Sequence, residues 1–202
     1  ALCNQGIEDT NLAFQNSNID AQVYLVHTVE VEYTESDGST ALDALRSSSD
    51  GVIDNVHSLR NQYGADCVSL FINFSTSAGL GYRMLSESTN FASNAFSIVD
   101  PDNVGGLTLT HELGHNWGCH HAVGDKSPDP LTRGEAIFDY AHGWRWNNNA
   151  NRSIMAYTPG TRVRYFSNPN VIHSGFPTGR SNLEDNARTI NQTRDTVESV
   201  SY

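Results

Sequence analysis

Alternation of apolar and polar residues marks the segment 21–33, AQVYLVHTVEVEY, and this period of two predicts a β-strand. Apolar residues then recur at helical spacing from Thr40 to Tyr63, with the SSSDG stretch at 47–51 as a weak point. Thr40 suits the N-cap of this helix and Gly64 suits its stop. The apolar stripe of the helix consists of Leu42, Leu45, Val52, Val56 and Leu59.

Two short apolar runs, CVSLFINF at 67–74 and AFSIVD at 95–100, predict buried strands. The strand, helix and strand that end at residue 74 form a right-handed crossover unit, so we expect a mainly parallel sheet. Between the two runs, STSAGLGYRML at 75–85 is glycine-rich and then extended, which predicts a loop that leads into an edge strand. This order of elements indicates the α/β (α+β) fold class.

The C-terminal half contains two further helical patterns on either side of an irregular stretch rich in Pro, Gly, Asp and Asn. One helix is predicted from about Leu107 to Trp117, and Gly118 ends it. Helical spacing returns from Asn182 and predicts an amphipathic C-terminal helix. The chain has 202 residues and no internal repeat, so we expect a single domain, 1–202. The apolar positions of the last helix are Leu183, Ala187, Ile190, Val197 and Val200.

Charge and termini narrow the function classes. The formal net charge is −11 and Lys and Arg total 12, which argues against a nucleic-acid partner. No stretch resembles a membrane span. The first ten residues lack the basic and apolar blocks of a signal peptide, so we expect a secreted protein to have lost its signal and pro-segment already.

The three cysteines, Cys3, Cys67 and Cys119, allow either one disulfide with one thiol or three thiols. Their spacing fits no zinc knuckle, and the sequence does not choose among the three pairings. We expect one disulfide, formed in an oxidising compartment.

The stretch LTLTHELGHNWGCHH, 107–121, holds four of the eight histidines. Because positions four apart share one face of a helix, His111 and His115 can point two imidazoles at one metal ion, with Glu112 beside them. The ion that such a pair most often binds is zinc, which takes three protein ligands at catalytic sites and one water. With Gly118 and His121 included, chance would produce the pattern in roughly 1 of 20,000 such chains.

Two residues compete for the third ligand position. Gly118 permits a left-handed turn that would bring His121 to the metal, and His120 would then point away as a surface or neighbouring residue. Alternatively, Glu135, with Asp139 four residues later, copies the spacing of thermolysin-like zinc peptidases. The sequence GDKSPDP at 124–130 is a poor match for the long helix that such a glutamate needs, so we favour His121.

HELGHNWGCHH is similar to the His-Glu-x-x-His-x-x-Gly-x-x-His signature of the metzincin zinc endopeptidases. Met155, in SIMAY, lies where that family has a methionine turn beneath the metal. AFSIVD and GGLTLTHELGHNWG resemble the reprolysin or adamalysin branch, and YFSNPNVIHSGFPTGR with DNARTINQTR resembles bacterial secreted peptidyl-Asp metallopeptidases. The chain departs from adamalysins at Ala122, where they have aspartate, and in its few cysteines.

The resemblance implies a metzincin-like catalytic domain with a twisted, mostly parallel mixed sheet, an antiparallel edge strand, an active-site helix and a C-terminal helix. A cleft would separate an upper part, about 1–121, from a lower part, about 122–202. It also implies a monomer, secreted after removal of a signal and pro-segment, that cleaves polypeptides and binds neither nucleic acid nor membrane.

The implied chemistry is peptide hydrolysis at one catalytic zinc ion, with Glu112 as the general base. Tyr157 matches the position from which astacins and serralysins stabilise the reaction intermediate, although it could equally be a core tyrosine. An inactive binding module with the same fold is the alternative function, and the presence of Glu112 argues against it. Calcium is a weaker candidate cofactor, on DKSPDP and DPDN.

Substrate is expected to lie extended along the edge formed by Gly79, Leu80 and Gly81. The segment TPGTRVRYF after the methionine turn would form the specificity pocket. Its two arginines, Arg162 and Arg164, would make that pocket cationic and favour an acidic residue just after the cleaved bond. Arginines on a strand are more often simply solvated, which is the competing interpretation.

Overall fold

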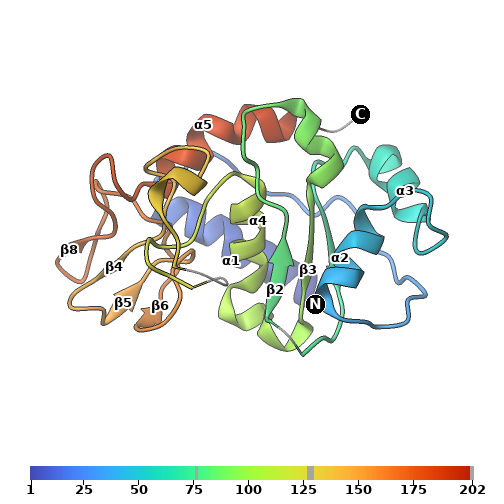
Figure 1. Cartoon of the computed structure of the whole chain (residues 1–202), viewed down its shortest axis with the longest axis horizontal. Helices are drawn as coiled ribbons and strands as arrows, with labels where there is room; N and C mark the ends of the chain where they lie inside the picture. The colour runs from blue at the N-terminus through green and yellow to red at the C-terminus, as the bar shows by residue number, and fades with distance from the viewer. Residues whose placement is uncertain (76, 127–129, 201–202) are drawn as a thin grey trace.

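A central helix, α4 (Thr108–Asn116), carries the HELGH motif through the middle of the molecule (Figure 1). The computed structural model describes residues 1–75, 77–126 and 130–200. To one side of α4 lies a small sheet with its helices, and to the other side lies a part dominated by loops and two-residue strands. The site is therefore built where two differently organised regions meet.

The main sheet has three strands in the order β1 (Val68–Phe71), β3 (Phe96–Val99), β2 (Gly79–Gly81). β1 and β3 run parallel, and β2 pairs with β3 in the antiparallel sense. β3 is buried along its whole length, as expected for a continuous apolar run in the centre of a sheet. The mixed α/β class and the antiparallel edge strand predicted from the sequence are thus confirmed.

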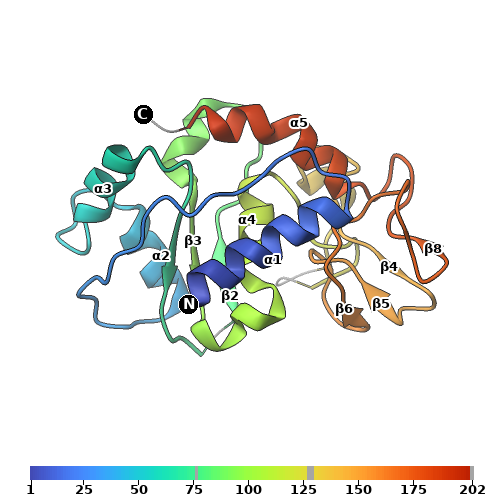
Figure 2. The same cartoon turned by 180° about the vertical axis from the view of Figure 1, so that it is seen from behind.

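Helices cover this sheet and α4. α2 (Gly38–Arg46) packs on the sheet through Ala41, Leu42 and Leu45. α1 (Leu2–Asn16) crosses in front of α4 in Figure 2, and its Gly6 meets the side chain of Leu109. The sequence did not predict α1, because its apolar positions are few and interrupted by polar residues. The C-terminal helix was predicted and is present as α5 (Asn186–Glu198).

The predicted strand at 21–33 is wrong, and with it the strand, helix and strand crossover unit that it would open. The segment is extended but forms no ladder, and a cavity of about 530 Å³ separates it from β1. Val31 and Tyr33 pack against the core that contains β1, whereas Tyr24 is 70% exposed. The apolar alternation of the sequence is therefore not matched by alternating burial, since Leu25 and Val29 are 40% and 53% exposed.

The single helix predicted at 40–63 is two helices, α2 and α3 (Asn55–Tyr63). The break falls at the SSSDG stretch, whose serines and aspartate favour turns over helix. The N-cap is Asp37, not Thr40: the Asp37 carboxylate accepts hydrogen bonds from the Thr40 amide and hydroxyl, at 3.1 and 2.6 Å. Gly64 ends α3 in the left-handed conformation, as predicted.

All three cysteines are free, so the expected disulfide is wrong. Cys119 is fully buried at the end of α4, where its thiol lies 3.7 Å from the Asn186 carbonyl oxygen. Burial raises the pKa of Cys67 to about 12. Across the described residues, no helix combines the length and the apolar content that a bilayer crossing requires.

Apart from α5, the loop-rich part contains only short strands and a 3-10 helix. Ile190 and Val197 of α5 belong to the core around α4. Asp185 caps α5, accepting a hydrogen bond from the Arg188 amide at 3.0 Å. The short strands are β4 (Arg145–Trp146), β5 (Asn151–Arg152), β6 (Thr161–Arg162), β7 (Ile172–His173) and β8 (Phe176–Pro177). The 3-10 helices are η1 (Thr89–Asn94), η2 (Pro101–Gly106) and η3 (Arg133–Glu135).

Candidate active site

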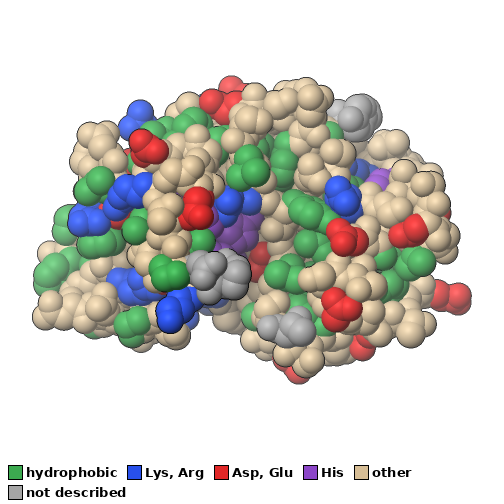
Figure 3. Space-filling view, in the orientation of Figure 1, with side chains coloured by type: hydrophobic (Ala, Val, Ile, Leu, Met, Phe, Trp, Pro, Cys, Tyr) green, Lys and Arg blue, Asp and Glu red, His purple; other side chains and the backbone are tan. Residues whose placement is uncertain are grey.

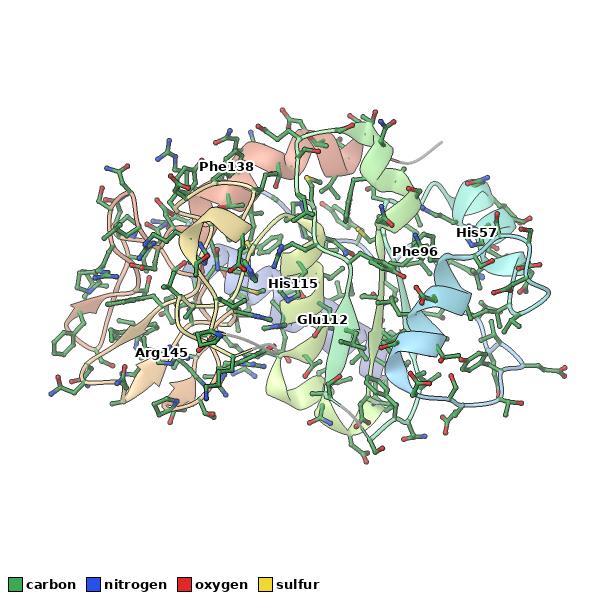
Figure 4. All side chains as sticks on the ribbon, in the orientation of Figure 1. His57, Phe96, Glu112, His115, Phe138 and Arg145 are labelled. Atoms are coloured by element: carbon green, nitrogen blue, oxygen red, sulfur yellow. The ribbon has the colours of Figure 1, made fainter. Side chains whose placement is uncertain are left out.

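One helix and one turn bring three histidines together. His111 and His115 lie one turn apart on α4, and Figure 4 shows His115 and Glu112 on this helix at the centre of the molecule. Gly118, with φ of 84°, ends the helix in a conformation that favours glycine, as the sequence predicted. The chain then reverses so that His121 returns to the other two.

The three imidazoles converge through their Nε2 atoms. His121 Nε2 lies 3.0 Å from the Nε2 atoms of both His111 and His115. Tetrahedral zinc ligands, each about 2.0–2.1 Å from the metal, would be about 3.3 Å apart. The spacing is therefore close to that of a zinc site.

The protonation state of the imidazole rings is also suited to binding a cation. His111 Nδ1 and His115 Nδ1 donate to the carbonyl oxygens of Ile154 and Cys119, at 2.9 and 2.8 Å. Because a carbonyl can only accept, Nδ1 carries the proton and Nε2 presents a lone pair. Burial lowers the pKa of all three histidines, to about 4 for His115, so the neutral, metal-binding form is favoured.

Within the described part of the chain, these histidines form the one group of three or more His, Cys, Asp or Glu residues that could hold a metal ion. Each is 5 to 7% exposed. In Figure 3 histidine side chains appear at the bottom of a hollow between the two parts of the molecule. A ligand could therefore approach the cluster from solvent on this side.

Glu112 is buried against β2. An added Cβ at Gly79 would lie 2.7 Å from Glu112 Oε1, and one at Gly81 would lie 3.2 Å from Oε2. Burial raises the pKa of Glu112 to about 8, and the positive charge of Arg162 acts in the opposite direction. Burial thus makes this carboxylate a stronger proton acceptor than a solvent-exposed glutamate.

Packing explains the residue types in the sequence Gly79-Leu80-Gly81. Both glycines face α4 and leave room for Glu112, whereas the Leu80 side chain points to the other side of the sheet, toward Gly38 of α2. The structure places β2 beside the candidate base, at the antiparallel edge of the sheet.

Met155 lies beneath the histidines and is fully buried. A Cβ on Gly114, in the HELGH motif, would lie 2.7 Å from the Met155 sulfur. A Cβ on Gly143 would lie 2.6 Å from the Met155 carbonyl carbon. Neither glycine was singled out from the sequence, because each is required by a residue that is distant along the chain.

Tyr157 packs against two of the histidines. The centroid of its ring lies 4.3 Å from that of His121 and 6.1 Å from that of His111. Its backbone amide donates to Asp125 Oδ2 at 2.9 Å, and its carbonyl accepts from Arg145 Nε at 2.9 Å. The structure therefore brings Tyr157 to the cluster that the sequence predicted.

The two arginines predicted for the specificity pocket separate. Arg162 lies close enough to Glu112 for their charges to interact, and its Nη1 donates to the Gly106 carbonyl oxygen at 3.1 Å. Its Nε is buried without a hydrogen-bond partner in the described residues, and burial lowers its pKa to about 10. Arg164 instead forms an ion pair with Asp9 of α1, at 2.8 Å.

Glu135 lies away from the imidazoles. It is exposed, and its carboxylate accepts a hydrogen bond from the Thr132 amide at 2.6 Å, within the capping box of η3. Asp139 is also exposed. The structure groups His121, and not Glu135, with the two helical histidines.

Two other histidines form hydrogen bonds with the backbone of His121 but do not belong to the cluster of three. His120 Nδ1 accepts a hydrogen bond from the His121 amide at 2.9 Å, and burial and Arg83 lower the His120 pKa to about 3. His142 Nδ1 donates to the His121 carbonyl oxygen at 2.9 Å. The sequence did not point to His142, because the bridge between residues 120 and 142 joins segments without a strand pattern.

The acidic residues considered for calcium have other partners. Asp100 caps η2 and accepts from the Asp102 amide at 3.0 Å, and Asp125 holds Tyr157 and Arg145. Asp129, the other aspartate of DKSPDP, lies outside the described residues. Nothing in the described part of the chain gathers oxygen ligands for calcium.

Comparison with known proteins gives consistent results. The sequence profile described as Metallo-peptidase family M12, of the reprolysin type, matches residues 2–167. Proteins named peptidyl-Asp metalloendopeptidase are similar over nearly the whole chain. The one from Xanthomonas campestris pv. campestris is 32% identical over 96% of this chain and 45% of its own length. One from Stenotrophomonas maltophilia is 33% identical over 98% and 47%.

The chain thus spans about half the length of these relatives. A solved structure described as a chaperone-substrate complex contains a chain with the same fold. It has a TM-score of 0.74 and 19% identity, over 98% of this chain and 30% of that one. The profile match includes α4, Gly118 and the methionine beneath the histidines. The chain therefore belongs to the M12 family of metallopeptidases.

Proposed function

We propose that this chain is a zinc-dependent endopeptidase domain that hydrolyses peptide bonds of extended polypeptides. The observation that carries the proposal is the convergence of three neutral imidazoles with Glu112 one residue from the first of them. His111, His115 and His121 would hold the zinc ion. When bound, zinc lowers the pKa of a water molecule toward about 7 and polarises the carbonyl group of the substrate.

Glu112 would move the proton. Its carboxylate accepts a proton from the attacking water and then delivers it to the nitrogen of the departing amine. Burial against the two glycines of β2 raises the pKa of Glu112 to about 8, which makes its carboxylate a stronger proton acceptor than an exposed glutamate. The Tyr157 hydroxyl would donate a hydrogen bond to the oxygen of the scissile carbonyl as negative charge develops there.

The substrate would add to the free edge of β2, at Gly79 to Gly81, next to Glu112. Arg162 would receive an acidic side chain just after the cleaved bond, since it is a partly buried cation whose buried Nε has no hydrogen-bond partner in the described residues. The names of the relatives, which mention peptidyl-Asp, support this preference. Arg164 does not enter the proposal, because its guanidinium is paired with Asp9.

We further propose that the protein is secreted from a bacterial cell and acts as a monomer. The support is the bacterial origin of the relatives and the resemblance to secreted enzymes. Recovery of the activity from washed cells and not from the culture medium would contradict the secretion.

The main test is hydrolysis of casein by wild type, by wild type with a chelator, and by Glu112→Gln. We expect the chelator to abolish turnover, zinc to restore it, and Glu112→Gln to lower kcat by roughly 10²- to 10⁴-fold. Zinc content should stay at one ion per chain in the variant. An unchanged kcat in Glu112→Gln would refute the role of Glu112.

Specificity is tested with two matched peptides that carry Asp or Leu just after the cleaved bond. Arg162→Gln should reduce the Asp-over-Leu ratio of kcat/KM, and Arg164→Gln should leave this ratio as in wild type. A ratio near one in the wild type would contradict the acidic preference. Absence of any turnover in zinc-loaded, folded protein would favour the alternative function, a binding module.

A further inference from the structure

One ion pair holds both backbone polar groups of Tyr157. Asp125 Oδ2 accepts from the Tyr157 amide, and Asp125 Oδ1 accepts from the Arg145 guanidinium. Arg145 Nε in turn donates to the Tyr157 carbonyl oxygen. Asp125 is 4% exposed, so solvent competes little for these bonds. Asp125, Arg145 and Tyr157 therefore form a closed ring of contacts, which we name the Tyr157 clamp.

The clamp joins three separate stretches of the loop-rich part. Asp125 lies four residues past His121, Arg145 begins β4, and Tyr157 follows the methionine turn. Figure 4 shows Arg145 on the loop-rich side of the molecule and Glu112 on α4. The loop that carries the third histidine thus also carries the group that holds Tyr157.

Tyr157 has no strand ladder to fix its backbone, because it lies between β5 and β6. With its amide and its carbonyl both held, the direction of its Cα–Cβ bond is set, and with it the place of the ring. That ring lies against His121 at a centroid distance of 4.3 Å. Small displacements of the backbone would move the phenol relative to the histidines.

Stability alone is a weak explanation for the clamp. Buried ion pairs contribute little net stability, because removing two charges from water offsets most of their attraction. Backbone groups in a loop can be satisfied by water or by neutral side chains. Here the charged pair instead bonds the backbone of a residue whose ring lies against two of the histidines.

We propose that Asp125 and Arg145 are positioning residues that hold the Tyr157 ring against the histidine cluster. The effect on turnover rests on the proposed peptidase function, in which the Tyr157 hydroxyl acts on the substrate. The effect on the position of the ring does not, and it is measurable without metal or substrate.

The first test follows the His121 ring protons by NMR in the metal-free protein. The tyrosine ring current shifts these signals, so Tyr157→Leu defines their position without it. We expect Asp125→Asn and Arg145→Gln to move the His121 signals toward the Tyr157→Leu values. Glu184→Gln is the matched control: Glu184 is also a buried carboxylate bonded to arginines, but these are Arg133 and Arg180 and not the arginine of the clamp.

His121 signals that stay at their wild-type positions in folded Asp125→Asn and Arg145→Gln would overturn the proposal. The same shift in Glu184→Gln would also overturn it, because the effect would then be general. If one clamp variant does not fold, the other still decides, since Asp125 bonds the Tyr157 amide and Arg145 bonds the Tyr157 carbonyl oxygen.

The second test is kinetic. Asp125→Asn should lower kcat about tenfold with little change in KM, as expected for a misplaced catalytic group. The same substitution should have almost no further effect in a Tyr157→Phe background, because the hydroxyl to be positioned is then absent. An equal loss in both backgrounds would contradict positioning. If wild type shows no turnover, the peptidase proposal fails, and the NMR result still decides the role of the clamp.

Discussion

Gly114 is the position of the HELGH motif that touches the methionine beneath the histidines. A Cβ there would lie 2.7 Å from the Met155 sulfur and 3.1 Å from the Phe166 ring. The glycine is therefore explained by close packing, because the helix has no positive φ at this residue. Glycine at this position lets Met155 pack directly against the helix that carries His111 and His115.

Gly114→Ala should destabilise the protein by about 1–3 kcal/mol, the usual effect of overpacking a core. Urea unfolding of the metal-free protein measures this difference. Gly134→Ala is the control, since nothing lies within 4 Å of the added Cβ there and its φ is not positive. Equal stabilities of the two variants would mean that Met155 moves aside without a penalty.

Sequence reasoning at the residue scale succeeded where all the partners are local. His111, His115, Gly118 and His121 span eleven residues, and helix geometry with one glycine turn is enough to relate them. It could not separate Arg162 from Arg164, because two residues apart on an extended chain gives both the same face. The separation depends on Asp9, which lies on a helix that the sequence did not predict.

β2 is the element that connects the sheet to the candidate base. It is only three residues long, and its glycines allow it to pack directly against α4. This contact buries Glu112 and so raises its pKa. An edge strand with a bulkier sequence would hold the helix farther away.

Gly79→Ala should lower kcat by roughly 10- to 100-fold, because the new Cβ would displace the Glu112 carboxylate. Gly105→Ala is the matched control, since its Cβ would make only an ordinary contact, 3.7 Å from Gln5 Nε2. Steady-state kinetics on one peptide checks both variants. Wild-type kcat in Gly79→Ala would show that the carboxylate tolerates the displacement.

The sequence predicted correctly those elements whose apolar positions are determined by burial alone. β1, β3 and α5 each owe their apolar positions to one buried face or core. The segment 21–33 alternates equally well, yet pairing also requires backbone contact with β1, and no side-chain pattern encodes that contact. α1 was missed because much of its buried face consists of Gly6, Asp9 and Thr10.

At the scale of the whole molecule, the three free thiols show that, within the described residues, no disulfide joins the two parts, which are held by a shared core and by polar contacts such as Arg164–Asp9. One large core includes residues from α1, α4, α5 and the methionine turn. Stability should therefore not depend on redox conditions, whereas it should depend on metal.

Thiol titration checks that stability does not depend on a disulfide. In denaturant without reductant, Ellman's reagent should detect three thiols per chain, and in native buffer Cys119 should not react because it is fully buried. A fully reduced sample provides the reference. Detection of one thiol in denaturant would restore the disulfide expected from the sequence.

Zinc removal checks that stability depends on the metal. At a free zinc concentration of about 100 times Kd, binding stabilises the folded chain by about 2.7 kcal/mol. For a chain of this size that raises Tm by roughly 5–10 °C. Scanning calorimetry should show this increase in wild type and not in His121→Ala. The same increase in both would place the metal elsewhere.

The compactness of the ligand set along the chain has a consequence for how the site is assembled. The three imidazoles need only a short loop to close, and short loops close quickly and at small entropic cost. Met155, Tyr157 and Arg162 reach the cluster from more than thirty residues away and only once the remaining backbone is in place. The three histidines can therefore come together before the residues proposed to act with them arrive, so that the proposed affinity for the ion and the proposed cleavage activity arise at separate moments of folding.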